Sequence, residues 1–473
     1  MKRIFFLSLL LLSITGVYAQ SSAEYIKNGN AKLDEGEPLA AAVEFEKAIE
    51  GDARSHEAYY GLGVAMAAIN NYESALKSLN KAIEINSNYA DAFLQRGLVC
   101  QSMSKTDDAI ADYDRAIGIN PNFEEAYLWR GMAKEGKGNV QGALSDYSKV
   151  MQMVPGSPTP YIYSGKLKLS QGKPEEALAD FDAAIKADPS SADAYCARGT
   201  FWNMQNDYQR AFTDLLKAIE IEPNLPDPYW ELASVKTSLR MFDSAIEDYS
   251  KLISMEPLNP KGLISRGLAK AMKGDMEGAL HDYDRVMVLY PNNGEVYFHR
   301  SKLKSYQQDF KGAIEDINES IRLMPENWEM YVDRAGYKFS LGDYSGARQD
   351  YSTIIKVFAD NPDLYMSRAG ISVSIGQYAE AMPDFNKAVS LSPNSPQYIF
   401  QRGRARAEMK DYKGAISDFD KAISLAPQIP YAYTDRGIAK CLSGNKSGGC
   451  DDIRKAMELG DPQAAEANAK YCK

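Results

Sequence analysis

Residues 124–157 read EEAYLWRGMAKEGKGNVQGALSDYSKVMQMVPGS, and this 34-residue stretch holds the features that decide the fold. Tyr127 stands four residues before Gly131, and Ala143 and Tyr147 follow at fixed distances. The same pattern recurs every 34 residues along most of the chain, without insertion or deletion. Self-similarity at a period of this length is typical of a repeat solenoid, in which each unit buries its apolar face against its neighbours.

Two small positions fix the register of the repeats. The first is Gly, Ala or Ser in all thirteen units: Gly29, Gly63, Gly97, Gly131, Gly165, Gly199, Ala233, Gly267, Ser301, Ala335, Ala369, Gly403 and Gly437. The second, twelve residues further on, is Ala41, Ala75, Ala109, Ala143, Ala177, Ala211, Ala245, Ala279, Ala313, Ala347, Ala381, Ala415 and finally Gly449. Small residues allow two helices to cross closely, because a larger substituent would push their axes apart.

Large residues and prolines complete a helix–turn–helix unit. A mostly aromatic residue stands four positions before the first small residue, and a second bulky residue stands four positions after the alanine. This spacing gives each helix an apolar stripe. Nine units carry proline where the second helix must end: Pro121, Pro155, Pro189, Pro223, Pro257, Pro291, Pro325, Pro393 and Pro427. The pattern predicts two antiparallel helices in every unit.

This pattern of aromatic residue, Gly, Ala, aromatic residue and Pro resembles the tetratricopeptide repeat over residues 22–463. The resemblance implies an all-α fold, a right-handed superhelical solenoid of thirteen 34-residue helix–turn–helix repeats. We expect a C-terminal capping helix over residues 464–473. It also implies that the first helix of each pair lines a concave groove, that the partner is a protein or peptide, and that no cofactor is used.

The first nineteen residues have the layout of a Sec signal peptide. Lys2 and Arg3 precede an apolar run over residues 4–12, and small or polar residues lead to Ala19. We expect cleavage after Ala19, so that Gln20 begins an exported protein of the periplasm, the outer surface or the extracellular space. The alternative is an uncleaved membrane anchor, but the apolar run is short for a span of about 20 residues. We therefore predict no stable membrane insertion after cleavage.

One departure from the family pattern is an arginine directly before the first small position in nine repeats: Arg96, Arg130, Arg198, Arg266, Arg300, Arg334, Arg368, Arg402 and Arg436. Sixteen residues later each of these repeats has an aspartate: Asp112, Asp146, Asp214, Asp282, Asp316, Asp350, Asp384, Asp418 and Asp452. In a helical hairpin these positions lie at similar height on facing helices. We expect structural Arg–Asp pairs, with a basic groove for an acidic ligand as the alternative.

The groove residues follow from the resemblance, which places positions two, five, nine, twelve and thirteen of each first helix on the concave side. The second position is acidic in eight repeats. This needs no binding role, because carboxylates favour the first turn of a helix through the helix dipole. The fifth position is mostly apolar, and these side chains form either a groove floor or packing between repeats. The candidate contacts are Trp230, Phe298, Tyr306, Phe339 and Phe400.

Three of the five cysteines fall in the last 33 residues. Cys450 and Cys472 stand at comparable distances from the turn at Gly460–Pro462, so in an oxidising compartment a disulfide between them would fasten the cap. The alternative is that both stay reduced. Cys100, Cys196 and Cys441 are expected to be free thiols.

Charge and motifs argue against other classes of function. A net charge of -10 disfavours nucleic acid as a partner. The three histidines are scattered, and the run at residues 131–138 resembles a phosphate-binding loop but lacks its Ser or Thr. We predict a non-catalytic interaction scaffold or adaptor of the cell envelope, without metal or cofactor. The alternatives are an envelope glycan- or polymer-binding protein that uses groove aromatics, and an enzyme of unrecognised type. The oligomeric state stays open.

Overall fold

The computed structural model describes residues 22–473, and its regular structure is helical over that range, with no strand among the described residues. The predicted signal peptide lies outside the described residues. After a helix over residues 22–34, the helices are α2 (Pro38–Gly51), α3 (His56–Ala68), α4 (Tyr72–Ile85), α5 (Ala90–Ser102), α6 (Thr106–Ile119), α7 (Glu124–Gly136), α8 (Val140–Met153), α9 (Thr159–Ser170), α10 (Pro174–Ala187), α11 (Ala192–Met204), α12 (Tyr208–Ile221), α13 (Pro226–Ser238), α14 (Phe242–Met255), α15 (Pro260–Lys273), α16 (Met276–Leu289), α17 (Gly294–Tyr306), α18 (Phe310–Leu323), α19 (Trp328–Ser340), α20 (Tyr344–Val357), α21 (Pro362–Ser374), α22 (Tyr378–Leu391), α23 (Pro396–Glu408), α24 (Tyr412–Leu425), α25 (Pro430–Leu442), α26 (Lys446–Glu458) and α27 (Ala464–Tyr471). The all-α repeat fold that the period predicts is confirmed.

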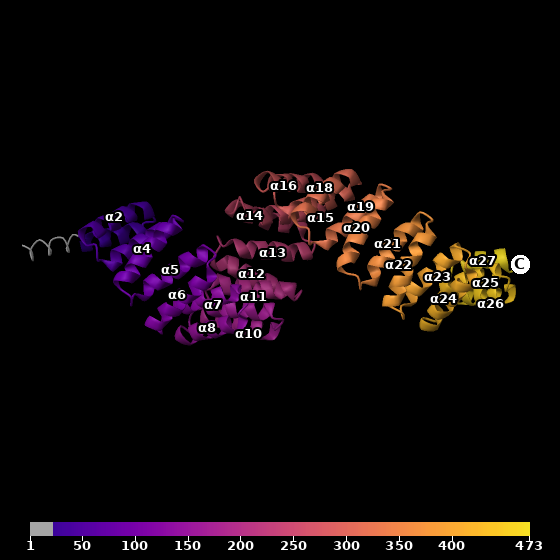
Figure 1. The fold of residues 1–473 in the computed structure, drawn as a ribbon, viewed down its shortest axis with the longest axis horizontal. Helices are drawn as coiled ribbons and strands as arrows, with labels where there is room; N and C mark the ends of the chain where they lie inside the picture. The colour runs from indigo at the N-terminus through magenta and orange to yellow at the C-terminus, as the bar shows by residue number, and fades with distance from the viewer. Residues whose placement is uncertain (1–21) are drawn as a thin grey trace, which may run out of the picture. The chain divides into compact units, whose positions relative to one another are not determined.

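Each repeat supplies a first helix, which has an odd label from α3 onward, and a second helix with an even label (Figure 1). Local chemistry sets the helix ends. Asp309 begins α18 by accepting a hydrogen bond from the backbone N–H of Gly312 at 3.0 Å, and Asn139 does the same for α8. The turn before α8 passes through Gly138 with φ of +76°, a conformation that favours glycine.

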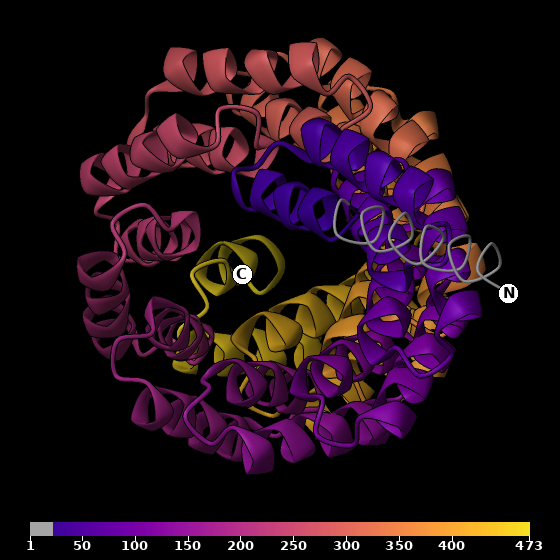
Figure 2. The ribbon, with the colours of Figure 1, turned by 90° about the vertical axis from the view of Figure 1, so that its left-hand side faces the viewer.

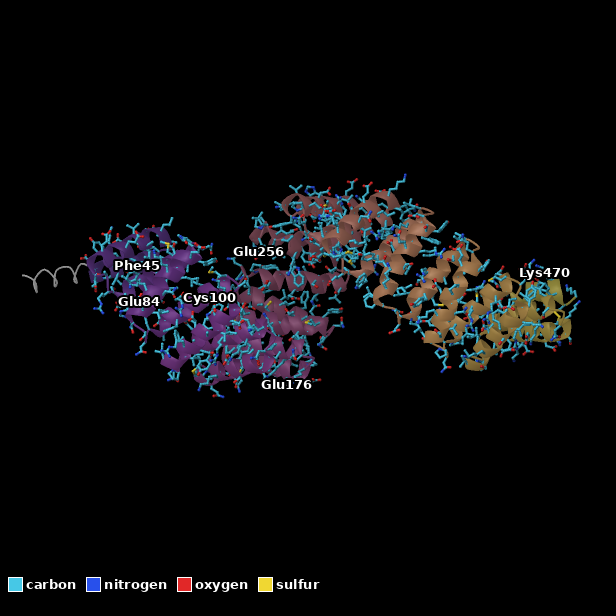
Figure 3. The ribbon with its side chains drawn as sticks, in the orientation of Figure 1. Phe45, Glu84, Cys100, Glu176, Glu256 and Lys470 are labelled. Carbon is cyan, nitrogen blue, oxygen red and sulfur yellow. A yellow bond between two sulfur atoms is a disulfide. The ribbon has the colours of Figure 1, made fainter. Side chains whose placement is uncertain are left out.

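The two helices of a repeat cross at the small positions. A Cβ added to Gly131 would lie 2.6 Å from Cε1 of Tyr147, so the ring fills the space that a side chain would need. Ala143 and Tyr147 are both 0% exposed. Each repeat therefore has its own small core, shared mainly with its neighbours, as expected for a solenoid. In Figure 3 buried residues such as Phe45 lie among the helices, whereas Glu84 and Glu176 point outward.

The chain divides into two compact units, one ending at Leu239 and the other running over Arg240–Lys473. Within each unit successive first helices contact one another, as α9 does with α11 and α15 with α17, whereas second helices meet mainly the first helices beside them. The first helices form the tighter layer, so each unit curves with that layer inside (Figure 2). We call the exposed surface of the first helices the inner face.

A charged strut joins the helices in each of the nine Arg-containing repeats. Arg130 Nε and Nη2 donate to the two oxygens of Asp146 at 2.9 and 2.6 Å. Its Nη1 donates to Asp114, on the second helix of the preceding repeat, at 2.6 Å. The other eight arginines repeat this geometry, with Asn80, Asp182, Ser250, Asp284, Asn318, Ser352, Asn386 and Asp420 as the third partners. One guanidinium thus connects three helices with bidentate geometry.

The last repeat is covered by α27, which packs on α25 and α26. Ile453 and Ala456 of α26 are 0% exposed beneath Ala464 and Ala467 of the cap. The Cα atoms of Cys450 and Cys472 lie 5.6 Å apart, with their sulfurs at bonding distance.

Candidate functional site

The inner face of the second unit carries exposed apolar side chains. They belong to α15, α17, α19 and α25, and they are Leu268, Met272, Tyr306, Val332, Phe339, Tyr431 and Leu442. The most exposed is Tyr306, at 77%. On the first helices of the first unit, α3, α5, α7, α9, α11 and α13, Met204 is the large apolar residue that is similarly exposed. On the inner face, exposed apolar surface is therefore concentrated on the second unit.

The five predicted groove contacts have different environments. Tyr306 and Phe339 lie exposed on the inner face, and the Phe339 ring meets Tyr344 edge-on, with centroids 5.3 Å apart. Phe298 and Phe400 are only 8% and 4% exposed, so both are core residues and not open contacts. Phe400 packs between Phe419 and Tyr431 at centroid distances of 5.5 and 4.7 Å. For these two, the packing alternative describes the structure.

The fifth candidate, Trp230, is half-buried in α13, and its indole N–H is buried without a hydrogen-bond partner. Beside it in sequence, the Glu231 carboxylate accepts a hydrogen bond from the Asn203 side chain at 3.2 Å. Burial raises the pKa of Glu231, and Asp227 adds to the rise. These residues place a partly buried polar group on the inner face of the first unit.

A second polar group lies next to Phe298 in the other unit. The Lys302 ammonium lies 4.2 Å from the centroid of the Phe298 ring, 2.7 Å from Glu329 and 3.6 Å from Asp333. Burial raises the pKa of Asp333, and the Lys302 ammonium beside its Oδ2 opposes the rise. The group connects α17 to α19 and borders Tyr306 and Val332 on the same two helices, so apolar and charged side chains alternate there.

A third polar group lies near the C-terminal end of the inner face. Asp435 on α25 faces Arg404 on α23 at 3.5 Å. Burial raises the pKa of Asp435 to about 6, Arg404 opposes this, and Asp461 and Glu408 reinforce it. Tyr431, 49% exposed, precedes Asp435 by one helical turn.

The strut arginines are not a free basic groove. In the predicted pairs Arg130–Asp146, Arg300–Asp316 and Arg402–Asp418, the guanidinium already donates to both carboxylate oxygens. Their third contact is also filled within the protein, by Asp114, Asp284 and Asn386. Each of these guanidinium groups is thus paired with side chains of the protein itself and is only 15–19% exposed, so the arginines do not form an open basic groove.

Two open hollows lie on the second-helix side. One, of about 680 Å³, is lined by Tyr344, Ser345, Arg348, Gln349, Ser352, Ile375, Gln377 and Glu380. The other, of about 510 Å³, is lined by Tyr127, Arg130, Gln141, Leu144, Ser145, Asp146, Ser148, Lys149 and Gln152. Neither includes any of the five predicted contacts, and their linings are largely polar. Because they are open to solvent and largely polar, neither resembles an enclosed ligand pocket.

Among the described residues, one group of cysteines brings potential metal ligands close together. The sulfurs of Cys441, Cys450 and Cys472 lie within 4.8 Å of one another. If Cys450 and Cys472 are bonded, only one thiol remains, which is too few ligands for a stable site.

His299 is half-buried against Tyr283, with ring centroids 6.2 Å apart, and burial lowers its pKa.

Sequence reasoning missed two sets of residues that had a readable signal. A second basic side chain, four residues after the strut arginine, also reaches the aspartate in six repeats: Lys134, Lys270, Lys304, Lys338, Arg406 and Lys440. The third strut partner is Asn, Asp or Ser sixteen residues before each arginine. In the repeat that has Leu232 in place of the arginine, the residue sixteen positions earlier is the apolar Leu216, so the two positions change together. Glu231, Asp333 and Asp435 share one repeat position, two residues before the first small residue, but the acidic residue recurs only in these three repeats, so it was not read as part of the pattern.

An all-α array of this kind, with an exposed inner face and no enclosed pocket among the hollows described above, belongs to the class of helical repeat solenoids. Models of the tetratricopeptide repeat match residues 90–123, 164–226, 332–396 and 396–429, and a TPR repeat model matches residues 67–104. The chain is a tetratricopeptide repeat protein. This repeat fold is typically a non-catalytic scaffold for protein–protein interaction.

Solved structures give similar repeat arrays. The chain is 28% identical to YrrB, described as a TPR protein with an unusual peptide-binding site, over 37% of this chain and 90% of that one, with a TM-score of 0.32. It is 12% identical to the APC/C hetero-tetramer Cut9–Hcn1, over 98% and 99%, with a TM-score of 0.41. For Pseudomonas aeruginosa pilF the identity is 17%, over 45% and 96%, with a TM-score of 0.39. No curated protein matches the chain. In the described part of the chain, no helix combines the length and apolarity needed to cross a bilayer.

Proposed function

We propose that the chain is a non-catalytic adaptor of the cell envelope that holds a protein or peptide on the inner face of its second unit. The observation that supports this is the set of exposed apolar side chains on α15, α17, α19 and α25. Exposed apolar side chains bordered by charges are typical of protein-binding surfaces.

The arrangement fits a protein segment better than a small molecule. Tyr306 and Phe339 provide large, rigid contact area, which is the kind of residue that dominates binding energy. The neighbouring Lys302, Glu329 and Asp333 supply both a donor and acceptors beside them. An amphipathic helix or an extended segment presents apolar and polar groups at similar spacing.

The proposed location follows from the N-terminal sequence and not from the described structure. Lys2, Arg3, the apolar run over residues 4–12 and Ala19 support export. N-terminal sequencing of the native protein should return a chain that begins at Gln20. A chain that still begins at Met1 would contradict export by cleavage.

Capture from envelope extract tests the binding proposal. Immobilised mature protein should retain a protein partner. The double variant Tyr306→Ala, Phe339→Ala should lower the retained amount at least about tenfold, since a hot-spot truncation costs about 2 kcal/mol or more and about 1.4 kcal/mol is a factor of ten. The matched control is Val288→Ala on α16, where an equally exposed apolar side chain (82%) belongs to a second helix.

The control variant should bind as the wild type does. An equal loss in both variants would mean general surface stickiness. Retention of glycan alone, unaffected by protease treatment of the extract, would favour the glycan-binding alternative and overturn this proposal.

A further inference from the structure

The C-terminal cap holds three cysteines from three helical segments at one point. Cys441 is on α25, Cys450 is on α26, and Cys472 directly follows α27. Their sulfurs all lie within 4.8 Å of one another. A bond between Cys450 and Cys472 therefore has a third sulfur next to it, whereas the free thiols Cys100 and Cys196 are buried elsewhere in the first unit.

The last repeat differs from the others at the place where this third sulfur lies. Every other repeat has alanine at the position of Gly449. A Cβ added to Gly449 would lie 2.4 Å from Cys441 Sγ and 2.6 Å from the backbone oxygen of Gly437, so alanine would require both the sulfur and the facing helix to move. The sulfur fills the space at which the helices of the other repeats carry a methyl group. This substitution gives Cys441 a defined place beside the other two cysteines.

We propose that Cys441 is an internal nucleophile for the Cys450–Cys472 bond, so that the cap exchanges disulfides without an external oxidant or reductant. The proposal rests on that bond, which the exported location would favour. It is independent of what the inner face binds.

The exchange is balanced within the three residues. Cys441 loses its proton to solvent, and the thiolate attacks Cys450 Sγ. A Cys441–Cys450 bond forms, the Cys450–Cys472 bond breaks, and the electron pair leaves on Cys472, which takes up a proton. One disulfide and one thiol are present before and after. Cys472 is the favoured leaving group because it stands beyond the end of α27, next to the chain terminus.

The surroundings of Cys441 set the conditions for exchange. The side chain is half-buried, with Tyr433, Ile438 and Tyr471 in the same cluster. Its sulfur lies 3.8 Å from the carbonyl oxygen of Lys446. Burial raises the pKa of this thiol, the Lys446 charge opposes the rise, and Asp452 adds to it. Exchange should therefore be slow near neutral pH and accelerate about tenfold for each pH unit, because only the thiolate attacks.

Exchange would release the cap from the last repeat. With Cys472 free, α27 is held on α25 and α26 by non-covalent contacts alone. Those contacts cover Ile453 and Ala456, which are fully buried. The open end of the array could then expose apolar surface without any change in overall oxidation state.

The test uses the full mature chain with its disulfide intact. Native protein is incubated with iodoacetamide at pH 7, 8 and 9, quenched in acid, and mapped by non-reducing peptide mass spectrometry. We expect labelled Cys472 together with a Cys441–Cys450 cross-linked peptide, both accumulating with time and faster at higher pH. In Cys441→Ser, Cys472 should stay unlabelled, while Cys100→Ser should behave as wild type.

Two results would overturn the proposal. One is wild-type protein in which Cys441 becomes labelled while the Cys450–Cys472 peptide stays intact throughout. The other is labelling of all five cysteines in denatured, unreduced protein, which would show that the bond does not form. A circular dichroism spectrum of Cys441→Ser that matches wild type rules out misfolding as the cause of lost exchange.

Discussion

The struts make a quantitative prediction, because two repeats differ in one partner. In the repeat of Arg300, the Lys304 ammonium also contacts Asp316, at 2.8 Å. In the repeat of Arg368 the equivalent residue is Ser372, and Arg368 alone supplies the charge for Asp384. The carboxylates are similarly buried, with side chains 5% and 10% exposed. Removing the arginine therefore leaves one aspartate partly paired and the other alone.

Arg368→Ala should cost about 3–5 kcal/mol, the usual effect of leaving a buried charge without its partner. Arg300→Ala should cost about 2 kcal/mol, because Lys304 still pairs with Asp316 and the other freed carboxylate, Asp284, is 58% exposed. In a repeat array such effects are local. The assay is therefore hydrogen exchange of the backbone amides in the two helices of each repeat, read by mass spectrometry.

A cost of 3 kcal/mol corresponds to exchange about 150-fold faster, and 2 kcal/mol to about 30-fold. The control Arg368→Met, Asp384→Leu replaces the pair by apolar side chains and should recover most of the protection. Equal acceleration in the two single variants would refute the argument that the lysine compensates. No acceleration in either would show that the struts contribute nothing to stability.

Three further predictions test other parts of the molecule. The pKa of Asp435, raised by burial to about 6, lies above its unfolded value of about 4. The protonated carboxyl therefore contributes folding stability that is complete below pH 4 and is lost as the pH rises through 6. In urea unfolding, the free energy of unfolding of Asp435→Asn should exceed that of the wild type by about 1–2 kcal/mol at pH 8 and equal it at pH 4. The same difference in free energy of unfolding between variant and wild type at both pH values would contradict this. Gly131→Ala should destabilise the protein by about 1–3 kcal/mol, since its Cβ would meet Tyr147 at 2.6 Å, whereas Gly118→Ala, with nothing within 4 Å, should stabilise α6 by up to about 1 kcal/mol; thermal unfolding with the opposite order would refute the close-approach argument. Thiol titration of denatured, unreduced protein should find three free groups, and Cys472→Ser should lower stability by about 3 kcal/mol on the chain-entropy model for a separation of 22 residues; unchanged stability would argue against a cap fastened by a disulfide.

The fold was predictable because the same pattern of small and bulky residues recurs in every repeat. The small residues at the helix crossing and the bulky residues beside them recur in phase, so pattern and packing agree at each level. The sixteen-residue offset between Arg130 and Asp146 was readable for the same reason. The division of the chain after Leu239 had no counterpart in the period.

The candidate site was less predictable, because it depends on what differs between repeats. Phe298, Val332 and Phe400 occupy the same position in their repeats, yet only Val332 is exposed above a third, at 38%. Their exposure is decided by neighbours such as Lys302, which covers the Phe298 ring. A position in the repeat fixes the face of the helix, whereas the adjoining repeats decide whether that face is open.

The struts also divide the array into regions of different cooperativity. Arg is replaced by Asn28, Leu62, Ser164 and Leu232 in four repeats, all in the first unit. In the second unit an unbroken series runs from Ser250 on α14 to Asp452 on α26, each arginine reaching back to the helix before it. Nearest-neighbour coupling determines how far a local opening spreads along a solenoid. The second unit should therefore unfold as one block, whereas in the first unit local opening should stop at the repeats that lack a strut. The greater rigidity of the second unit suits it to present a binding surface.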